Sequence, residues 1–107
     1  MSTDKWSDKE KKVARRAFDI ALERERDALL AEFKLKAVAA NNFDDLWEIR
    51  QYLKERLNGV DSKYDYRYSQ LIYVFGFLLR EKRVTEEELA GIAEEKLKLI
   101  RAVATDW

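Results

Sequence analysis

Proline is absent from the whole 107-residue chain, and this absence limits the fold more than any other feature of the sequence. Proline breaks a helix because it lacks a backbone donor and its ring clashes with the preceding turn. The chain has only three glycines, whereas it is rich in the helix-favouring residues alanine, leucine, glutamate, lysine and arginine. The sequence therefore predicts an all-α fold of long helices whose ends are set by capping residues.

The first predicted helix begins at a capping box, in which Ser7 is followed three residues later by Glu10. It runs to about residue 40 along an apolar stripe formed by Val13, Ala14, Ala17, Phe18, Ala21, Leu22, Ala28, Leu29, Phe33, Ala37 and Val38. Five charges of alternating sign, residues 23–27, interrupt this stripe. Such a run usually forms a solvated face, but it is also typical of a charged seam where the helices of a stalk meet through ion pairs.

The second predicted helix covers residues 42–57 and ends before the Asn58–Gly59 pair. Asn42 is its N-cap. The acidic Asp44 and Asp45 lie in the first turn, where the positive end of the helix dipole favours negative charge. On a helical wheel four apolar residues fall within about 80° of one another. They form a predicted core stripe of Leu46, Ile49, Leu53 and Leu57.

Two more helices are predicted in the second half of the chain. The third covers residues 61–81, is apolar on all sides between residues 71 and 79, and carries Gly76, where another backbone can approach closely. A buried strand is rejected for residues 71–79 because no other segment could pair with it. The fourth helix begins at the capping box of Thr85 and Glu88. Its apolar stripe is Leu89, Ile92, Ala93, Lys96, Leu99, Ile100 and Val103.

Composition excludes several classes of function. The 21 basic and 21 acidic residues give zero net charge, whereas proteins that bind the nucleic-acid backbone carry a basic excess. The absence of histidine and cysteine removes the commonest general base, the thiolate nucleophile and the commonest zinc ligands. We interpret Tyr64, Tyr66 and Tyr68 as buried at a helix junction rather than stacked on nucleobases, because they do not share a helical face. No enzyme, metal or cofactor is predicted.

The expected organisation is a single helical domain over residues 1–107, since the chain is too short for two. Its N-terminal ten residues are polar and have no signal-peptide pattern. The longest apolar run, residues 71–79, is too short to cross a bilayer. We therefore expect a cytoplasmic protein without membrane insertion and without a nucleic-acid partner.

Trp47 is the residue that most suggests protein binding. It lies among Arg50, Gln51 and Lys54, and tryptophan together with arginine is enriched at interfaces. The alternative is that Trp47 covers the seam between two helices of its own chain. Because a chain this short has little core of its own, we also expect a homodimer. The residues predicted for its interface are Phe18, Leu22, Leu29, Leu46, Leu53 and Leu57.

An ordered set of short motifs resembles the fluorescence recovery protein family of cyanobacteria. The motifs are Asp-Asp-Leu-Trp at 44–47, Asp-Ser-Lys-Tyr-Asp-Tyr-Arg at 61–67, Val-Phe at 74–75 and Glu-Glu-Leu at 87–89, with Trp-Ser at 6–7. The resemblance implies an all-helical, dimeric regulator that works without a cofactor. Such proteins bind the orange carotenoid protein, chiefly its C-terminal domain, in the red quenching form. They speed its return to the orange form and end quenching of the phycobilisome.

The resemblance also assigns roles to particular residues. Trp47 matches the tryptophan of the family's partner-binding face, Tyr73 an aromatic residue of the head, and Lys98 a lysine late in the last helix. Arg50 and Gln51 stand where the family has histidine and aspartate, and Leu57 where it has arginine. The predicted partner-binding set is Trp47, Arg50, Gln51, Lys54, Tyr73 and Lys98. The changed residues favour the alternative of a diverged helical, dimeric adaptor with a different protein partner. A location at the periphery of the thylakoid membrane follows if the source is cyanobacterial.

Overall fold

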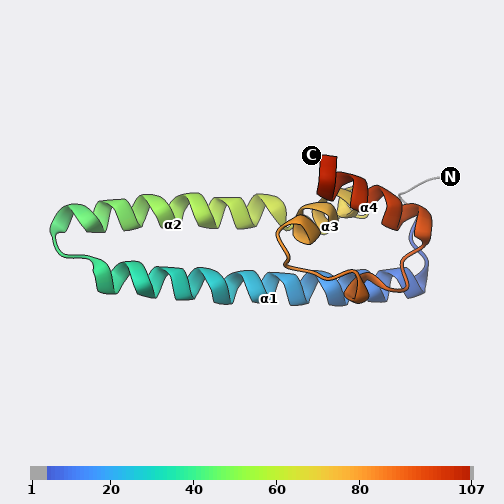
Figure 1. Cartoon of the computed structure of the whole chain (residues 1–107), viewed down its shortest axis with the longest axis horizontal. Coiled ribbons are helices and arrows are strands. Elements are labelled where there is room, and N and C mark those ends of the chain that lie inside the picture. Colours follow the sequence, from blue (N-terminus) through green and yellow to red (C-terminus); the bar gives the residue numbers. More distant parts are fainter. Residues whose placement is uncertain (1–4, 107) are drawn as a thin grey trace.

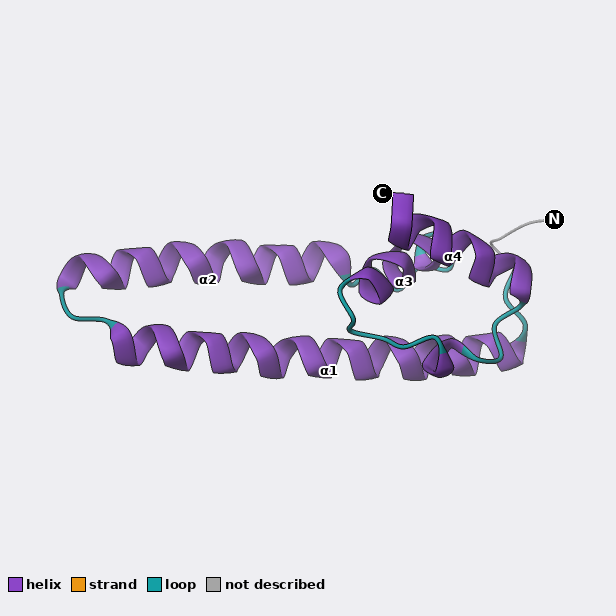
Figure 2. Ribbon diagram, viewed as in Figure 1, coloured by secondary structure: helices purple, strands orange, loops and turns teal. Residues whose placement is uncertain are grey.

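The computed structural model describes residues 5–106, which form four α-helices and one short 3₁₀-helix. The α-helices are α1 (Asp8–Ala39), α2 (Phe43–Lys63), α3 (Leu71–Arg80) and α4 (Glu94–Asp106), and the 3₁₀-helix is η1 (Glu87–Leu89). α1 and α2 make a long antiparallel hairpin, the stalk, and α3, η1 and α4 make a head at one end of it (Figures 1 and 2). The molecule measures 56 × 21 × 20 Å. The predicted elongated all-α fold, with a long first helix and a C-terminal head, is confirmed. Residues 1–4 and 107 of the predicted domain lie outside the described part.

The start of α1 and the turn between α1 and α2 are fixed by local hydrogen bonds. Ser7 begins α1 as predicted, since its Oγ accepts from the backbone N–H of Glu10 (3.1 Å) and its own N–H donates to the Glu10 carboxylate (2.9 Å). α1 ends at an extended Ala40, and Asn42 Oδ1 then accepts from the N–H of Asp45 (3.0 Å) to begin α2. The sequence therefore predicted both ends of α1 and the start of α2, because each is set within a few residues.

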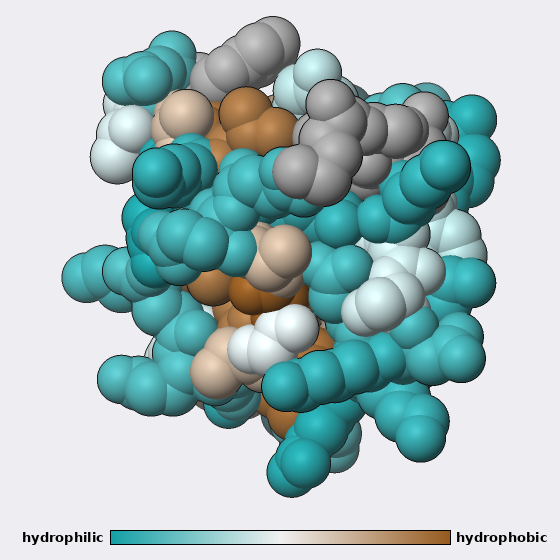
Figure 3. All heavy atoms as spheres, turned by 90° about the vertical axis from the view of Figure 1, so that its right-hand side faces the viewer, coloured by the Kyte–Doolittle hydropathy of each residue, from teal (hydrophilic) through white to brown (hydrophobic). Residues whose placement is uncertain are grey.

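The head closes on the N-terminal half of α1 through one apolar core. Its buried members are Trp6, Ala14, Ala17, Phe18, Ala21, Leu71, Ile72, Val74, Phe75, Leu78, Val84, Leu89, Ile92, Ile100 and Val103. α3 and α4 approach closely at Gly76, as the sequence predicts, and an added Cβ there would lie 2.4 Å from Val103 Cγ1. Arg80 donates to the terminal carbonyl oxygens of α4 at Val103 (2.7 Å) and Ala104 (3.0 Å). Seen from the head end, a narrow apolar strip lies between hydrophilic side chains (Figure 3).

The predicted break between the second and third helices was wrong. α2 continues through Gly59, which is exposed and has open space around it, and ends at Lys63. Residues 64–70 then form a non-helical linker rather than the start of the third helix, which begins only at Leu71. The tyrosine rings explain this linker, because Phe18 meets Tyr64 and Tyr66 edge-on, with centroids 5.4 and 4.9 Å away. As predicted, the tyrosines pack at a junction, but a non-helical linker carries them there.

The predicted start of the fourth helix was also wrong. The capping box of Thr85 and Glu88 does form, with reciprocal hydrogen bonds of 2.9 and 3.2 Å. It begins only η1, however, and α4 starts at Glu94 after Gly91, whose φ is +109°. Arg24 of α1 holds Glu88 through two hydrogen bonds of 2.7 Å each, which fixes η1 against α1. This turn lets Leu89 and Ile92 both enter the core.

α2 buries none of its residues within this chain. The predicted core stripe of the second helix is therefore wrong for a single chain, since Ile49 and Leu53 are half-buried and Leu46 and Leu57 are exposed. A two-helix hairpin provides only one neighbour for each helix, so the apolar face of α2 cannot be enclosed. The head has its own core, whereas the stalk lacks one.

Candidate functional site

Phe43, Trp47 and Arg50 form an exposed ladder on α2, which we call the Trp47 patch. Their spacing of four and three residues places the side chains on one helical face. The Phe43 and Trp47 rings meet edge-on with centroids 6.1 Å apart, and the Arg50 guanidinium lies 5.8 Å from the Trp47 ring centre. Trp47 is 56% exposed. It therefore does not cover a seam within its own chain, and its large apolar ring is available to another molecule.

Gln51 and Lys54 extend the same face toward the head. They lie four and seven residues after Trp47, and both side chains are exposed. Gln51 donates to the carboxylate of Glu55 (2.9 Å), which holds its amide along the helix. The structure therefore brings together four of the residues predicted to bind a partner, as a stripe of one aromatic anchor with two cations and an amide.

Tyr73 and Lys98 lie elsewhere, in the head. Tyr73 is on α3 and 40% exposed, and Lys98 is exposed on α4. Trp47 lies in the second turn of α2, near the hairpin turn at the opposite end of the stalk (Figure 1). One chain therefore presents two separate surfaces, and the predicted partner-binding residues do not form a single site within it.

An apolar groove runs between the two stalk helices, and we call it the stalk groove. It is lined by Leu29, Leu30 and Phe33 of α1 and by Leu53 and Leu57 of α2, with Arg26 at its edge, and its volume is about 330 Å³. Leu30 and Leu57 are each about half exposed. A contiguous exposed apolar surface of this kind usually marks a contact with another chain.

The residues predicted for the dimer interface are divided by the structure. Leu29, Leu53 and Leu57 line the stalk groove, and Leu46 is exposed on the same helix as the last two. Leu22 packs against the head core. Phe18 requires a correction, because it is buried in that core, 4% exposed, beneath Tyr64 and Tyr66. Its position on the apolar stripe of α1 indicated burial but not which neighbour would provide it.

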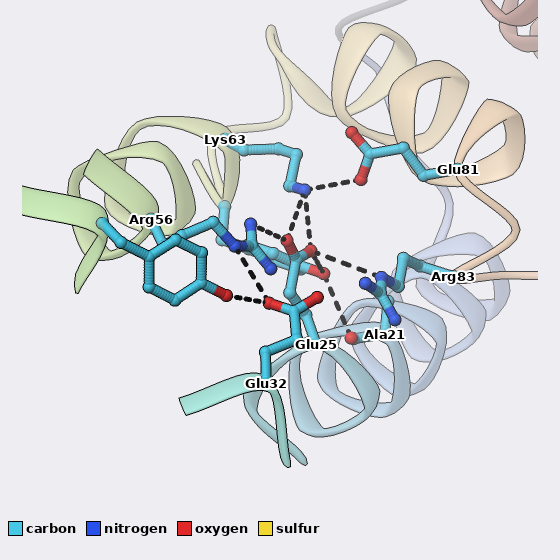
Figure 4. Close-up of polar contacts among 9 residues, drawn as sticks. Ala21, Glu25, Glu32, Arg56, Lys63, Glu81 and Arg83 are labelled. Atoms are coloured by element: carbon cyan, nitrogen blue, oxygen red, sulfur yellow. Dashed lines mark hydrogen bonds and ion pairs between the residues drawn. The ribbon is translucent and has the colours of Figure 1, made fainter. Parts of the chain in front are cut away.

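Glu25 is the centre of a buried ion-pair cluster at the joint between stalk and head (Figure 4). Its side chain accepts from Lys63 Nζ at 2.7 Å and from the Tyr64 hydroxyl at 2.8 Å. Arg56 and Arg83 lie 3.5 and 3.8 Å from its oxygens. In the charged run 23–27 only Glu25 is buried, and the other four residues are exposed. The run is therefore a solvated face at four positions and an ion-pair contact between the stalk helices at Glu25.

The electrostatics of this Glu25 cluster follow from burial and pairing. Burial alone would raise the pKa of Glu25, but the hydrogen bonds from Lys63 and Tyr64 outweigh it and lower the pKa. Burial and the neighbouring carboxylate raise the pKa of the Tyr64 hydroxyl, which therefore stays protonated. The network continues along the stalk, where the Tyr52 hydroxyl donates to Glu32 and Arg56 lies 3.4 Å from the same carboxylate.

A second buried ion pair, Glu10 with Lys96, ties the start of α1 to α4. Lys96 Nζ lies 3.1 Å from the Glu10 carboxylate, which also accepts from the N–H of Ala93 (2.9 Å). Burial raises the pKa of Glu10, but hydrogen bonds from the backbone of Ser7 and Ala93 and from Lys96 lower it to about 2. The sequence placed Lys96 in an apolar stripe without identifying its partner, which lies 86 residues away.

Across residues 5–106 no group of three or more acidic residues lies close enough together to hold a metal ion. Nor does that part of the chain contain a helix long and apolar enough to cross a bilayer. The arrangement offers exposed aromatic, cationic and apolar side chains on helices, which are suited to contacts with proteins.

The family model described as photoprotection regulator fluorescence recovery protein matches residues 6–104 of this chain. The chain belongs to this family. The fluorescence recovery protein of Synechocystis sp. PCC 6803 is 39% identical over 99 residues, which cover 92% of this chain and 91% of that protein. Its structure superposes with a TM-score of 0.89, covering 94% of this chain and 98% of the other. The fluorescence recovery protein of Fremyella diplosiphon gives the same TM-score at 36% identity and the same coverage. The resemblance read from the sequence motifs is thereby confirmed.

Membership of the fluorescence recovery protein family supports a regulatory role in photoprotection. The superposition covers the stalk and the head together, so the elongated all-α fold is shared with these relatives. The family description concerns regulation rather than a chemical reaction.

Proposed function

We propose that this chain binds the photoactivated orange carotenoid protein, chiefly its C-terminal domain, and accelerates its return to the resting orange form. Family membership supports a role in photoprotection. The observation that carries the proposal is the Trp47 patch, an exposed aromatic and cationic ladder on a helix that buries no residue of its own. An exposed tryptophan with a neighbouring arginine is typical of residues that dominate binding energy.

The mechanism needs no bond-making step by this protein. A regulator speeds the return of an open form if it binds the species between the open and resting forms more tightly than the open form itself. The Trp47 ring supplies apolar area, while Arg50 and Lys54 favour an acidic rim on the partner. Tyr73 and Lys98 of the head supply a second, smaller contact. Ending phycobilisome quenching would follow from the recovery of the resting form.

We also propose that two copies pair through the stalk groove. The half-exposed leucines of the groove would be enclosed by the same face of a second chain, which a two-helix hairpin cannot achieve alone. Enclosing apolar surface stabilises association by about 25 cal/mol per Å² before the entropy of association is subtracted. This pairing supplies the core that α2 lacks.

Dark recovery of the carotenoid protein tests the main proposal. The purified chain is added to the photoconverted red form, and the return of the orange absorbance is followed in darkness. We expect faster recovery with the wild type and at least a tenfold loss of potency with Trp47→Ala, about 1.4 kcal/mol of binding. Lys12→Ala, an exposed change on the head half of α1, is the matched control. No acceleration by the wild type at large molar excess would refute the proposal.

Light scattering tests the pairing of stalks. Leu57→Glu places a charge in the stalk groove, whereas Asn58→Glu places the same charge on the next, exposed position of α2. We expect a mass near 12.7 kDa for Leu57→Glu and twice that mass for the wild type and Asn58→Glu. A wild-type monomer at micromolar concentration would contradict the pairing.

A second candidate is a dimeric adaptor of the same fold with a different protein partner. Arg50 and Gln51, in place of the family's histidine and aspartate, favour it because they change the charge of the partner-binding face. This candidate predicts normal folding and dimerisation, no effect on carotenoid-protein recovery, and a co-purifying protein that is lost with Trp47→Ala. Either function would be carried out in the cytoplasm, at the thylakoid periphery if the source is cyanobacterial.

A further inference from the structure

Four segments of the chain meet at the buried carboxylate of Glu25 (Figure 4). α1 supplies Glu25 itself, α2 supplies Arg56 and Lys63, the linker supplies Tyr64, and the turn after α3 supplies Arg83. Lys63 also contacts Glu81, the residue that follows α3, at 2.6 Å. The Glu25 carboxylate therefore joins the C-terminal end of α2 to both α1 and the head, and Glu25 is only 1% exposed.

Apolar packing reaches this joint only through Tyr64, the residue after α2, whose ring meets Phe18 edge-on. The head core contains residues of α1, α3, α4 and the segments between them, but none of α2. Where packing is absent, the position of a helix end depends on its hydrogen bonds and ion pairs. Lys63 is suited to this task because it is the last residue of α2 and its side chain is only 15% exposed.

The cluster also holds a buried donor without a partner. Arg83 Nε has no hydrogen bond and lies 3.8 Å from Glu25 Oε1, beyond hydrogen-bond distance. A buried donor without an acceptor destabilises the arrangement that contains it. A small rotation of the Glu25 carboxylate toward Arg83 would satisfy this donor and lengthen the contact with Lys63. The same carboxylate thus has cations available on its α2 side and on its head side.

We propose that Glu25 is a conformational latch between stalk and head. With Lys63 bound, as observed, the end of α2 is held against α1 and the head. With the carboxylate turned to Arg83, Lys63 is released and the last turns of α2 move away from α1, while the head core stays intact. Elements with two discrete arrangements of similar energy are the usual basis of conformational switching.

The latch would determine how the two partner-binding surfaces face one another. Trp47 is carried by α2 and Tyr73 by the head, so a movement at the joint changes the distance between them. This consequence for binding depends on the proposed function, but the latch itself is a property of the free protein. Its test therefore needs no partner, and its failure is distinguishable from a failure of the proposed function.

Distances between spin labels test the latch directly. The natural chain has no cysteine, so labels attach only where cysteines are introduced. Asn58→Cys with Ala102→Cys reports on α2 against the head. Lys12→Cys with Ala102→Cys reports on the N-terminal part of α1 against α4, across the head core; all three positions are exposed. Labelled protein is mixed with excess unlabelled protein so that each distance lies within one chain. Glu25→Gln removes the charge of the carboxylate, and Lys63→Met removes the ammonium group that binds it.

We expect both variants to broaden the 58–102 distance distribution about twofold and to leave the 12–102 distribution narrow. Glu10→Gln is the matched control, because it removes the buried carboxylate that ties the start of α1 to Lys96 of α4, away from the joint, and should broaden neither distribution. Unchanged 58–102 distances in Lys63→Met would overturn the proposal, as would equal broadening of both pairs. Loss of helical circular dichroism in Glu25→Gln at 25 °C would also overturn it, since the carboxylate would then support the fold as a whole.

Discussion

The substitution Gly76→Ala tests the close packing of α3 on α4. The new Cβ would lie 2.4 and 2.5 Å from two side-chain atoms of Val103 and 3.1 Å from the carbonyl oxygen of Ile100. Val103 is buried and β-branched, so it cannot rotate aside, and the carbonyl belongs to the backbone of α4. The two helices must therefore separate. Overpacking of this severity is unfavourable by about 3 kcal/mol.

Alanine also favours a helix over glycine, which offsets part of this effect. The offset is about 1 kcal/mol in a helix interior. We therefore expect a net loss of about 2 kcal/mol of unfolding free energy, or a melting temperature lower by about 8 °C at fixed protein concentration. Urea and thermal unfolding followed by circular dichroism measure both quantities.

Gly59→Ala is the matched control for this substitution. Gly59 also lies inside a helix, but no atom stands within 4 Å of its added Cβ. Only the helix-propensity effect remains, so the same substitution should stabilise the protein by about 0.5–1 kcal/mol. Opposite signs for the two substitutions are the decisive result. If Gly76→Ala stabilised the protein as much as Gly59→Ala does, the close approach of α3 and α4 would be refuted.

Two further predictions concern the start of α1. The pKa of Glu10 is lowered on folding from an ordinary value of about 4.3 to about 2, so its contribution of about 3 kcal/mol is complete above pH 5 and is lost as the pH falls toward 2. Chemical unfolding across this range should show that loss, and Glu10→Gln should make the curve flatter; an equally steep curve in the variant would contradict the assignment. Ser7→Ala removes the acceptor for the N–H of Glu10 and should lower the unfolding free energy by about 1 kcal/mol, whereas an unchanged value in urea would show that the capping box contributes nothing.

The sequence predicts those parts of the fold that are set by neighbours in the chain. Ser7 with Glu10 marks the start of α1, and Asn42 marks the start of α2, because each cap satisfies backbone groups within three residues. The end of α2 could not be read in this way. Gly59 is tolerated in an exposed helix, and the helix stops at Lys63, where a side chain 38 residues away binds the last lysine.

The sequence of the linker carries a signal against the predicted helix. Tyr64, Tyr66 and Tyr68 recur at every second position, which is the period of an extended segment and not of a helix. What the pattern alone could not supply is the surface that receives the rings, since Phe18 lies on α1, nearly fifty residues earlier.

The candidate site shows the same difference between features set by neighbours in the chain and features set by distant segments. The adjacency of Trp47 and Arg50 follows from their spacing on a helix, whereas the exposure of Trp47 does not, since the sequence left open that it covers a seam of its own chain. Burial of Phe18, of Glu25 and of the Glu10–Lys96 pair depends on contacts between distant segments. An apolar stripe shows which face of a helix avoids water, but not whether the same chain or another one covers it.

Because the head core contains no residue of α2, the length of the stalk affects folding of the head mainly through the entropy of loop closure. The Glu10–Lys96 contact closes a loop of 86 residues, and pairing Glu25 with Lys63 shortens the path between them to roughly half. Loop-closure entropy grows only with the logarithm of length, so this shortening contributes roughly 0.5 kcal/mol. The head would therefore close almost as readily around a shorter or a longer hairpin. The number of helical turns in the stalk is therefore nearly free of constraints from the closing of the head core.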